Sequence, residues 1–138
     1  MDILTERPEF SPEYVVGIEQ VDREHQRLFE IAGRVYDSFI AGDKVASANI
    51  HREIAELLHY TATHFASEEA LMEAAGYPGL EAHKAQHRHL LSRARDMEMR
   101  VEIGEEFVPV ELNRFVVQWL TEHILVNDKE FGKFIRSN

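Results

Sequence analysis

The sequence predicts an all-α protein, an antiparallel up-down-up-down four-helix bundle preceded by an extended N-terminal arm. Apolar residues recur every three or four positions along four long segments, as on the inward faces of bundled helices. The 7 glycines and 4 prolines are few, and most of them lie outside these segments. No segment shows the alternation of a half-buried strand. The whole chain, 1–138, suits one domain with one core.

Glycine and proline mark the boundaries of the predicted helices. These helices extend over about residues 18–41, 43–75, 80–103 and from 109 to at least 126. Asp43 fits the N-cap of the second helix, and Pro109 fits the first turn of the fourth. Residues 1–17 form the predicted arm, and the bundle occupies 18–136. Because the connections are short, helices adjacent in sequence should be antiparallel.

Composition and charge exclude several classes of function. The chain has no cysteine, which excludes disulfides, thiolate metal sites and cysteine nucleophiles. Its formal net charge is −10, from 15 basic and 25 acidic residues, which disfavours nucleic acid and anionic membranes as partners. The N-terminus lacks the apolar run of a signal peptide, and no stretch approaches the ~20 apolar residues of a membrane span. A cytoplasmic protein is therefore expected.

Polar residues interrupt the apolar seams where the core of a bundle should be apolar. They are His25, His64, Glu68, His83, His87 and His123. One buried histidine is commonly satisfied by a hydrogen bond, but six such groups on four seams need a common partner, and a metal centre supplies one. In an up-down-up-down bundle, the first turns of helices one and three lie beside the ends of helices two and four. All six residues should therefore lie at one level.

The fourth seam changes phase after His123 and continues through Asp128, Phe131 and Ile135. The step of five residues from His123 to Asp128 is about 140° out of register in a straight α-helix. Both side chains can reach one centre if the helix bends or bulges near Val126-Asn127, so a local distortion is predicted there. Spacing alone leaves open that Asp128 is a surface N-cap of a short final helix.

Similar residues elsewhere are expected to face solvent. The histidines that lie off the seams are His51, His59 and His89. In the acidic pair Glu68-Glu69, only Glu68 lies on the inward face, so Glu69 is expected on the solvated side of its helix.

At these residues the sequence resembles the hemerythrin family in its bacterial single-domain form. The matching segments are Val21-Asp22-Arg23-Glu24-His25, His64-Phe65-Ala66-Ser67-Glu68-Glu69, Gly76-Tyr77-Pro78, His83-Lys84-Ala85-Gln86-His87, Trp119-Leu120-Thr121-Glu122-His123 and Asp128. The match covers about residues 10 to 136, and all seven ligand positions of the family occur in order with the family's local spacing.

The resemblance implies a non-haem di-iron centre in which two iron ions share an oxo or hydroxo bridge. One iron would be bound by His83, His87 and His123, and the other by His25 and His64. Glu68 and Asp128 would bridge the two ions. The second iron, with fewer protein ligands, would keep an open position for dioxygen.

The resemblance also implies a dry apolar pocket around the oxygen. Phe65, Trp119 and Leu120 are the candidates for its wall, although each also reads as ordinary core packing. Two segments depart from the family. Bacterial members usually carry a tryptophan in the arm, where this chain has residues 10–14, and many carry an asparagine in the first helix, where it has Ala32-Gly33. Neither departure touches a ligand position.

The implied function is reversible binding of dioxygen as a carrier or store rather than as an enzyme, by a chain expected to be monomeric. Two alternatives remain open: an oxygen or redox sensor that acts through a signalling partner, and a di-iron enzyme acting on peroxide or nitric oxide. Ferritin-like di-iron enzymes use two Glu-x-x-His pairs, whereas the single pair here, Glu56 with His59, lies off the seam. A structural zinc site is less well supported because zinc prefers four ligands. An oxygen-using enzyme is a possible recipient.

Overall fold

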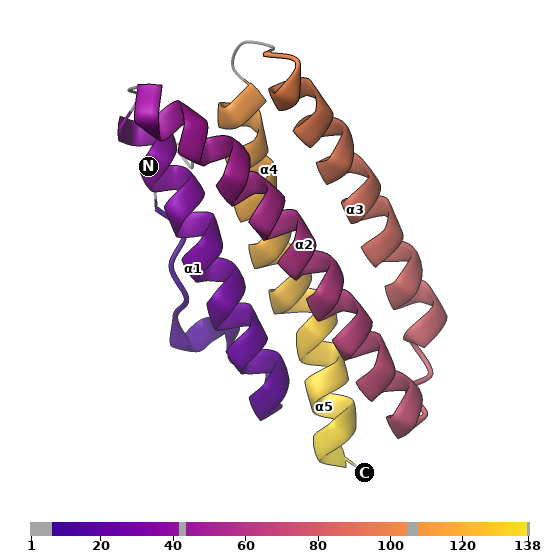
Figure 1. The fold of residues 1–138 in the computed structure, drawn as a ribbon. Coiled ribbons are helices and arrows are strands. Elements are labelled where there is room, and N and C mark those ends of the chain that lie inside the picture. The colour runs from indigo at the N-terminus through magenta and orange to yellow at the C-terminus, as the bar shows by residue number, and fades with distance from the viewer. Residues whose placement is uncertain (1–6, 42–43, 105–107, 138) are drawn as a thin grey trace.

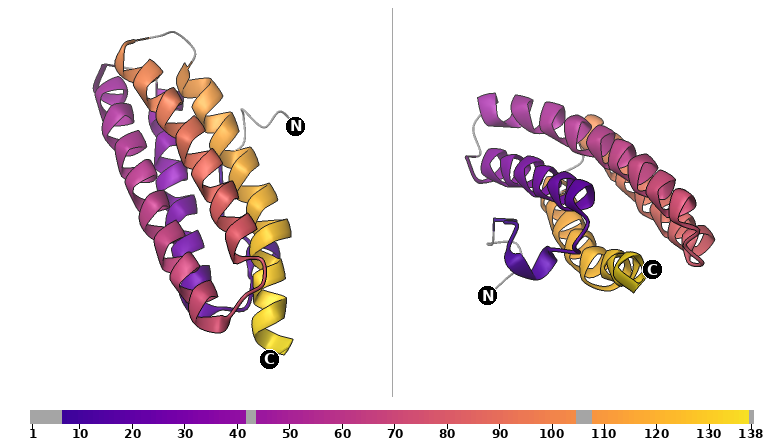
Figure 2. Two further views of the ribbon diagram at one scale, coloured as in Figure 1. Left: turned by 90° about the vertical axis from the view of Figure 1, so that its right-hand side faces the viewer. Right: turned by 90° about the horizontal axis from the view of Figure 1, so that it is seen from below.

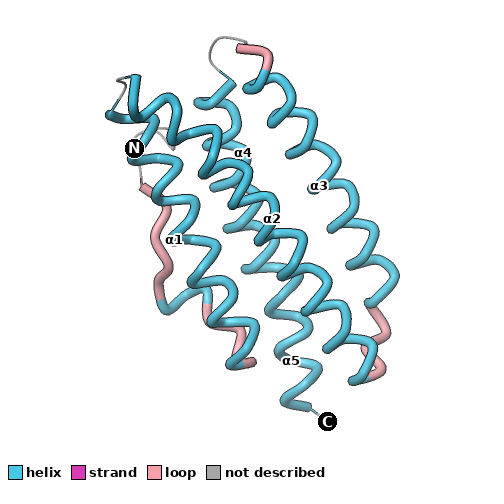
Figure 3. The backbone as a smooth tube through the Cα atoms, in the orientation of Figure 1, coloured by secondary structure: helices cyan, strands magenta, loops and turns pink. Residues whose placement is uncertain are grey.

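The computed structural model describes residues 7–41, 44–104 and 108–137, and within them the chain is helical with no strand. The helices form the predicted four-helix bundle (Figures 1 and 3). The elements are the short 3-10 turn η2 (Pro12–Tyr14), α1 (Glu19–Ala41), α2 (Lys44–Ala75), α3 (Leu80–Glu102), α4 (Val108–Glu122), the π-helical segment η3 (His123–Asp128) and α5 (Lys129–Ser137). None of the described helices is long and apolar enough to cross a bilayer.

The helices alternate in direction along the sequence. In Figure 1, α1 and α3 run from the lower end of the bundle to the upper end, and α2 and α4 run back down. The segments α4, η3 and α5 follow one another without a break and form a single long rod (Figure 2). The lower end therefore brings together the first turns of α1 and α3 with the last turns of α2 and the η3–α5 rod.

Glycine ends two of the helices as predicted. Gly76 follows α2 with a φ of +67°, and its N–H donates to the carbonyl of Glu73 at 3.1 Å. The N–H of Tyr77 donates to the carbonyl of Met72 at 3.0 Å, which completes the paired bonds of a Schellman motif. Gly104 follows α3 with a φ of +78°. The proposed cap at Asp43 lies outside the described residues, and Pro109 falls in the first turn of α4 as expected.

The distortion predicted near Val126-Asn127 is confirmed, and it is longer than expected. The π-helical segment spans the 6 residues of η3. At its end, the N–H of Lys129 donates to the carbonyl of Ile124, five residues earlier. Since hydrogen bonds in a π-helix join residues five apart, His123 and Asp128 fall on the same side of the rod.

The apolar seams form a continuous core between the helices. Its most deeply buried members, each at most 2% exposed, include Val21, Leu28, Ile31, Ile54, Leu57, Met72, Leu112 and Leu120. Burial of a large aliphatic side chain stabilises the folded state by about 1.5–3 kcal/mol. This core fixes the position of the four helices, and hence of the polar residues that they carry at the lower end.

The described part of the N-terminal arm, residues 7–17, is not extended throughout because it contains η2. Phe10 and Tyr14 pack against the ring of Phe29 on α1, with centroids 5.8 and 5.0 Å away. Arg7 donates to both carboxylate oxygens of Asp37 at 3.0 and 3.1 Å. Its guanidinium passes over Gly33, where a Cβ atom would come within 2.6 Å of it. The glycine at this departure from the family pattern therefore makes room for the arm.

The end of the arm is fixed between α1 and α5. Asp22 accepts hydrogen bonds from the N–H groups of Val16 and Gly17 at 2.8 and 3.2 Å. Arg136 of α5 donates to the carbonyl of Val16. Gly132 faces the same carbonyl so closely that an added Cβ atom would lie 2.1 Å from its oxygen. The end of the arm and the last helix thus meet at the lower end of the bundle.

Candidate metal centre

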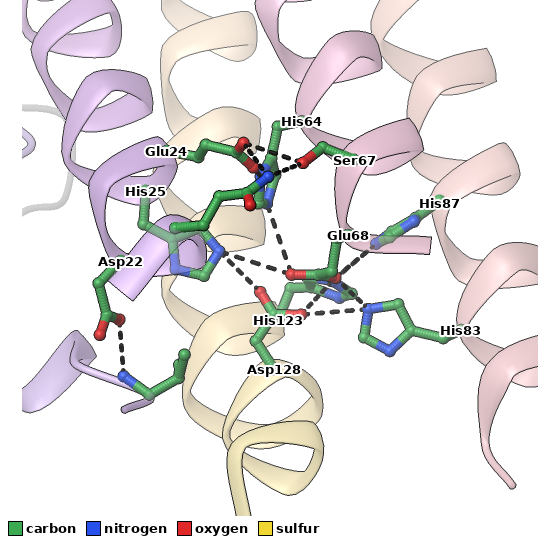
Figure 4. Close-up of polar contacts among 12 residues, drawn as sticks. Asp22, Glu24, His25, His64, Ser67, Glu68, His83, His87, His123 and Asp128 are labelled. Carbon is green, nitrogen blue, oxygen red and sulfur yellow. Dashed lines mark hydrogen bonds and ion pairs between the residues drawn. The ribbon is translucent and has the colours of Figure 1, made fainter. Parts of the chain in front are cut away.

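Seven polar side chains meet inside the lower part of the bundle (Figure 4). They are the residues predicted from the sequence: His25 on α1, His64 and Glu68 on α2, His83 and His87 on α3, and His123 and Asp128 on η3. Each is at most 6% exposed. The histidines expected to face solvent, at positions 51, 59 and 89, are exposed.

Local spacing explains why the seven side chains converge. The pairs on α2 and α3 are four residues apart, so the two members of each pair lie one above the other on one helix face. On the fourth rod the spacing is five, which an α-helix would not bring together. The π-helical segment corrects the register there. Asp128 therefore belongs to the cluster and is not a surface cap, being 1% exposed.

The cluster divides into two overlapping groups, each able to hold one cation. In each group, every residue offers one ligand atom within 4.8 Å of all the others. The first group consists of Glu68, His83, His87, His123 and Asp128, and the second of His25, His64, Glu68 and Asp128. The two carboxylates are common to both groups.

Glu68 turns one oxygen toward each group. Its Oε1 lies 2.7 Å from Nε2 of His83 and 3.4 Å from Nε2 of His87, in the first group. Its Oε2 lies 3.6 Å from Nε2 of His64 and 3.9 Å from Nε2 of His25, in the second. Such a division of oxygens is the one that a bridging carboxylate requires.

Asp128 divides its oxygens in the same way. Its Oδ1 lies 3.1 Å from Nε2 of His83 and 3.1 Å from Nε2 of His123. Its Oδ2 lies 3.0 Å from Nε2 of His25. Two carboxylates with this orientation, on different helices, span the two groups.

Several of these buried atoms lack a properly directed hydrogen bond within the described part of the chain. They are both ring nitrogens of His25, Oε2 of Glu68 and both oxygens of Asp128. A buried polar atom without a partner costs about 1–3 kcal/mol. Bound cations would satisfy these atoms. Imidazole and carboxylate donors without sulfur suit iron, manganese or zinc, and seven donors shared between two groups exceed the four that a structural zinc ion takes.

The metal-free cluster holds a proton on His83. Burial by itself lowers the pKa of His83, but its close contacts with the carboxylates of Asp128 and Glu68 outweigh burial and raise the pKa to about 9. His87 differs, because burial keeps its pKa below the ordinary value in spite of its contacts with Glu68 and Glu69. At neutral pH, His83 is therefore cationic and His87 is neutral.

Both shared carboxylates are ionised. Burial opposes their charge, but His123, His25 and His83 hold the pKa of Asp128 well below its ordinary range. Burial and the charge of Asp128 also act against the ionised form of Glu68, yet contacts with neighbouring histidines keep the pKa of Glu68 below its ordinary value. Negative charge is thus fixed at the point shared by the two groups.

Two further carboxylates lie just outside the cluster. Oε1 of Glu24 lies 2.6 Å from Nδ1 of His64, and Oε2 of Glu69 lies 2.7 Å from Nδ1 of His87. The expectation that Glu69 lies on the solvated side of its helix is therefore wrong: its side chain is only 24% exposed and contacts a buried ring. Both residues sit next in sequence to an inward-facing residue, His25 or Glu68, which is the signal that could have revealed them.

Aromatic rings cover the first group on one side. Phe65 stacks on the ring of His87, with centroids 3.6 Å apart and planes 2° apart. Trp119 stacks on His123 at 5.6 Å and meets Phe65 edge-on at 5.1 Å. Leu120 is 1% exposed and belongs to the apolar core. Phe65 and Trp119 therefore cover this side of the cluster.

Comparison with known proteins agrees with this geometry. The family model described as the hemerythrin HHE cation binding domain matches residues 16–135. The chain belongs to the hemerythrin family. Proteins named bacteriohemerythrin in Stenotrophomonas maltophilia and Pseudomonas aeruginosa are 32% and 35% identical to it, over 89% and 87% of this chain and 78% and 76% of their own lengths. Bacteriohemerythrin of Methylococcus capsulatus is 31% identical over 87% of this chain and 89% of its own length.

Solved hemerythrin structures share the fold. A wild-type hemerythrin crystal structure superposes with a TM-score of 0.82 at 29% identity, covering 91% of this chain and 95% of the other. The structure of a hemerythrin mutant in which alanine replaces one leucine gives the same TM-score over 91% and 93% of the two chains. This hemerythrin-family chain thus combines the family's bundle with a buried histidine and carboxylate cluster able to bind metal.

Proposed function

We propose that this protein binds dioxygen reversibly at a non-haem di-iron centre and serves as an oxygen carrier or store. The observation that carries the proposal is the pair of overlapping ligand groups, which share two ionised carboxylates and contain buried atoms without hydrogen bonds. The seven ligands would be His25, His64, Glu68, His83, His87, His123 and Asp128.

The two groups differ in a way that suits oxygen binding. The first group offers three histidines and the second offers two, so the ion in the second group would have fewer protein donors. When bound, a pair of iron ions supplies reversible two-electron transfer to dioxygen. The two shared carboxylates and the five imidazoles would hold the ions, and the packing of the four helices orients these side chains.

The surroundings of the cluster favour release of the ligand as dioxygen over its loss as superoxide or peroxide. Phe65 is 2% exposed and Trp119 packs beside it, and both rings lie against histidines of the first group. Exclusion of water limits the supply of protons at the centre. The wall formed by Phe65 and Trp119, together with the buried Leu120, is therefore assigned the task of keeping the centre dry.

The proposal is tested by metal analysis combined with visible spectroscopy. The reduced protein should contain two irons per chain. A charge-transfer band should appear when oxygen is admitted and disappear when it is withdrawn. Two irons with irreversible oxidation would favour the sensor or the enzyme instead. A chain that binds no iron under anaerobic loading would overturn the proposed centre.

A further inference from the structure

Two carboxylates outside the seven-residue cluster each face one of its two groups. Glu24 approaches His64, which belongs to the second group, and Glu69 approaches His87, which belongs to the first. In both pairs the histidine atom concerned is Nδ1, while Nε2 of the same ring faces Glu68, one of the two shared carboxylates. The close-up of the cluster includes the contact of Glu24 with His64 (Figure 4).

Glu24 is itself held in place by a small network. Its Oε2 accepts a hydrogen bond from Oγ of Ser67 at 2.9 Å and another from Nε2 of Gln20 at 3.3 Å. Gln20 also donates to Oγ of Ser67 at 2.6 Å. These bonds occupy one carboxylate oxygen and leave Oε1 free to face His64. Burial raises the pKa of Glu24, but the bonds from His64, Ser67 and Gln20 lower it below its ordinary value, which keeps the carboxylate ionised.

The two contacts arise from the same arrangement along the helices. Glu24 precedes the inward His25 on α1 and reaches across to a ring on α2. Glu69 follows the inward Glu68 on α2 and reaches across to a ring on α3. Both α1 and α2 thus contribute a member of the cluster and, beside it, a carboxylate that contacts a histidine of the next helix.

We propose that Glu24 and Glu69 are positioning residues, one for each metal ion, with Glu24 acting through His64 and Glu69 acting through His87. The inference rests on the proposed di-iron centre. An Nδ1–H group that donates to a carboxylate leaves Nε2 as the unprotonated atom aimed at the cluster, fixes the angle of the ring and makes Nε2 a stronger donor. The added negative charge also favours the more highly charged, oxidised state of the metal pair.

The test uses the full chain with Glu24→Gln and Glu69→Gln, each of which keeps a side chain of the same shape. Metal-free protein is loaded anaerobically with Fe²⁺, and the ions are then withdrawn by a competing chelator. Each variant should hold one ion as wild type does and bind the other about 10–100-fold more weakly. Glu19→Gln and Glu73→Gln, on exposed positions of α1 and α2, are the matched controls and should release both ions like wild type.

Two further measurements separate positioning from general damage. In a His25→Ala background, in which the second group is incomplete, Glu69→Gln should still weaken the remaining ion while Glu24→Gln should add little. The single variants Glu24→Gln and Glu69→Gln should each raise the reduction potential of the loaded protein, because each removes a negative charge. Ser67→Ala leaves every carboxylate in place, and it should weaken only the ion that Glu24→Gln weakens, by a smaller factor.

The outcomes are distinguishable. A wild-type chain that binds fewer than two ions overturns the proposed centre, and the inference with it. Two ions in wild type, with both variants retaining them unchanged, overturn the inference alone. Loss of both ions together in each single variant, with helical circular dichroism intact, also overturns it, since the assignment of one carboxylate to each ion would then be wrong.

Discussion

Oδ1 of Asp128 lies 3.1 Å from Nε2 of His123, although the two residues are five positions apart on one rod. The π-helical segment between them makes this approach possible. It also places the other oxygen of Asp128 3.0 Å from His25, on the far side of the cluster. A single carboxylate is thereby available to both ligand groups.

Asp128→Asn should weaken both metal ions, whereas loss of a histidine should weaken mainly one. The amide removes a negative charge from the point that the two groups share. Iron content after passage over a chelating resin would measure the effect, with fewer than one ion per chain expected. Asp96→Asn, at an exposed position of α3, is the control and should retain both ions. Full retention by Asp128→Asn would contradict a bridging role.

His64→Ala should abolish oxygen binding while leaving the bundle helical. His64 is one of two histidines in the second group, so its loss leaves that ion with a single histidine. Oxygen uptake and far-ultraviolet circular dichroism would be measured together. His59→Ala, an exposed histidine on the same helix, should behave as wild type. Normal uptake by His64→Ala would show that the second group does not bind the ion that meets oxygen.

Metal binding should release protons below about pH 9. His83 has its pKa raised to about 9 in the metal-free fold, so it carries a proton at neutral pH that a metal ion must displace. Apparent affinity should therefore rise with pH until about pH 9. Calorimetric titration with Fe²⁺ at pH 7 in buffers of different ionisation enthalpy would count the protons. Uptake of metal with no proton release would contradict this prediction.

The stability of the metal-free chain should depend on pH through the same residue. An unfolded histidine has a pKa near ~6.5, so a folded pKa of about 9 for His83 stabilises the fold fully below ~6.5. That stabilisation is lost as pH rises through 9. The pKa values of Glu68 and Asp128 are lowered in the folded state, so these carboxylates have the opposite pH dependence: the stabilisation that they contribute is lost in acid. Urea unfolding at pH 6.5 and 9.5 would measure the change, which His83→Gln should reduce.

Phe65→Ala should lower stability and shorten the life of the oxygenated protein. The ring is 2% exposed and stacks on His87, so its removal leaves a cavity and should cost about 3–5 kcal/mol. Water entering that space should speed irreversible oxidation, followed by visible absorbance in air. Ile54→Ala, a buried residue of the same helix whose loss should cost about 2–5 kcal/mol, is the control. Equal oxidation rates in the two variants would show that Phe65 only packs the core.

Gly132→Ala should destabilise the lower end of the bundle. The added methyl group would lie 2.1 Å from the carbonyl oxygen of Val16, so the arm or α5 must move. Such overpacking costs about 1–3 kcal/mol. Thermal unfolding would measure the loss, with Lys133→Ala, an exposed neighbour, expected to change stability by less than about 0.5 kcal/mol. An unchanged melting temperature would mean that the arm is loosely held.

Much of the fold and the cluster could be predicted because core positions repeat with the period of a helix. Histidines at such positions, like His25 and His87, conflict with the apolar pattern and so are visible in the sequence alone. Asp128 is harder to predict, because a spacing of five fits the cluster only where the helix is distorted, as it is in the π-helical segment. The change of phase in the fourth apolar seam predicts a distortion near Val126-Asn127, but it does not predict that the π-helical segment begins at His123 or that it spans 6 residues.

Contacts at the edge of the core were harder to predict. Glu69 reads as a solvated residue because half-exposed positions carry polar side chains for many reasons, and only the neighbouring helix reveals that its partner is His87. The turn within the arm has a similar cause, since proline is compatible with both an extended strand and a 3-10 turn. In both cases the local sequence allows two conformations or environments, and contacts with other helices determine which one is adopted.

The seven proposed ligands are spread along most of the chain, from His25 in α1 to Asp128 in η3. A nascent chain on the ribosome exposes His25 and His64 long before the residues that complete either group have been synthesised. Stable capture of a metal pair must therefore wait until η3 has been synthesised and has joined the bundle. The proposed centre would thus join the four helices only after all of them are present, and a truncated chain that lacks η3 would have neither ligand group complete.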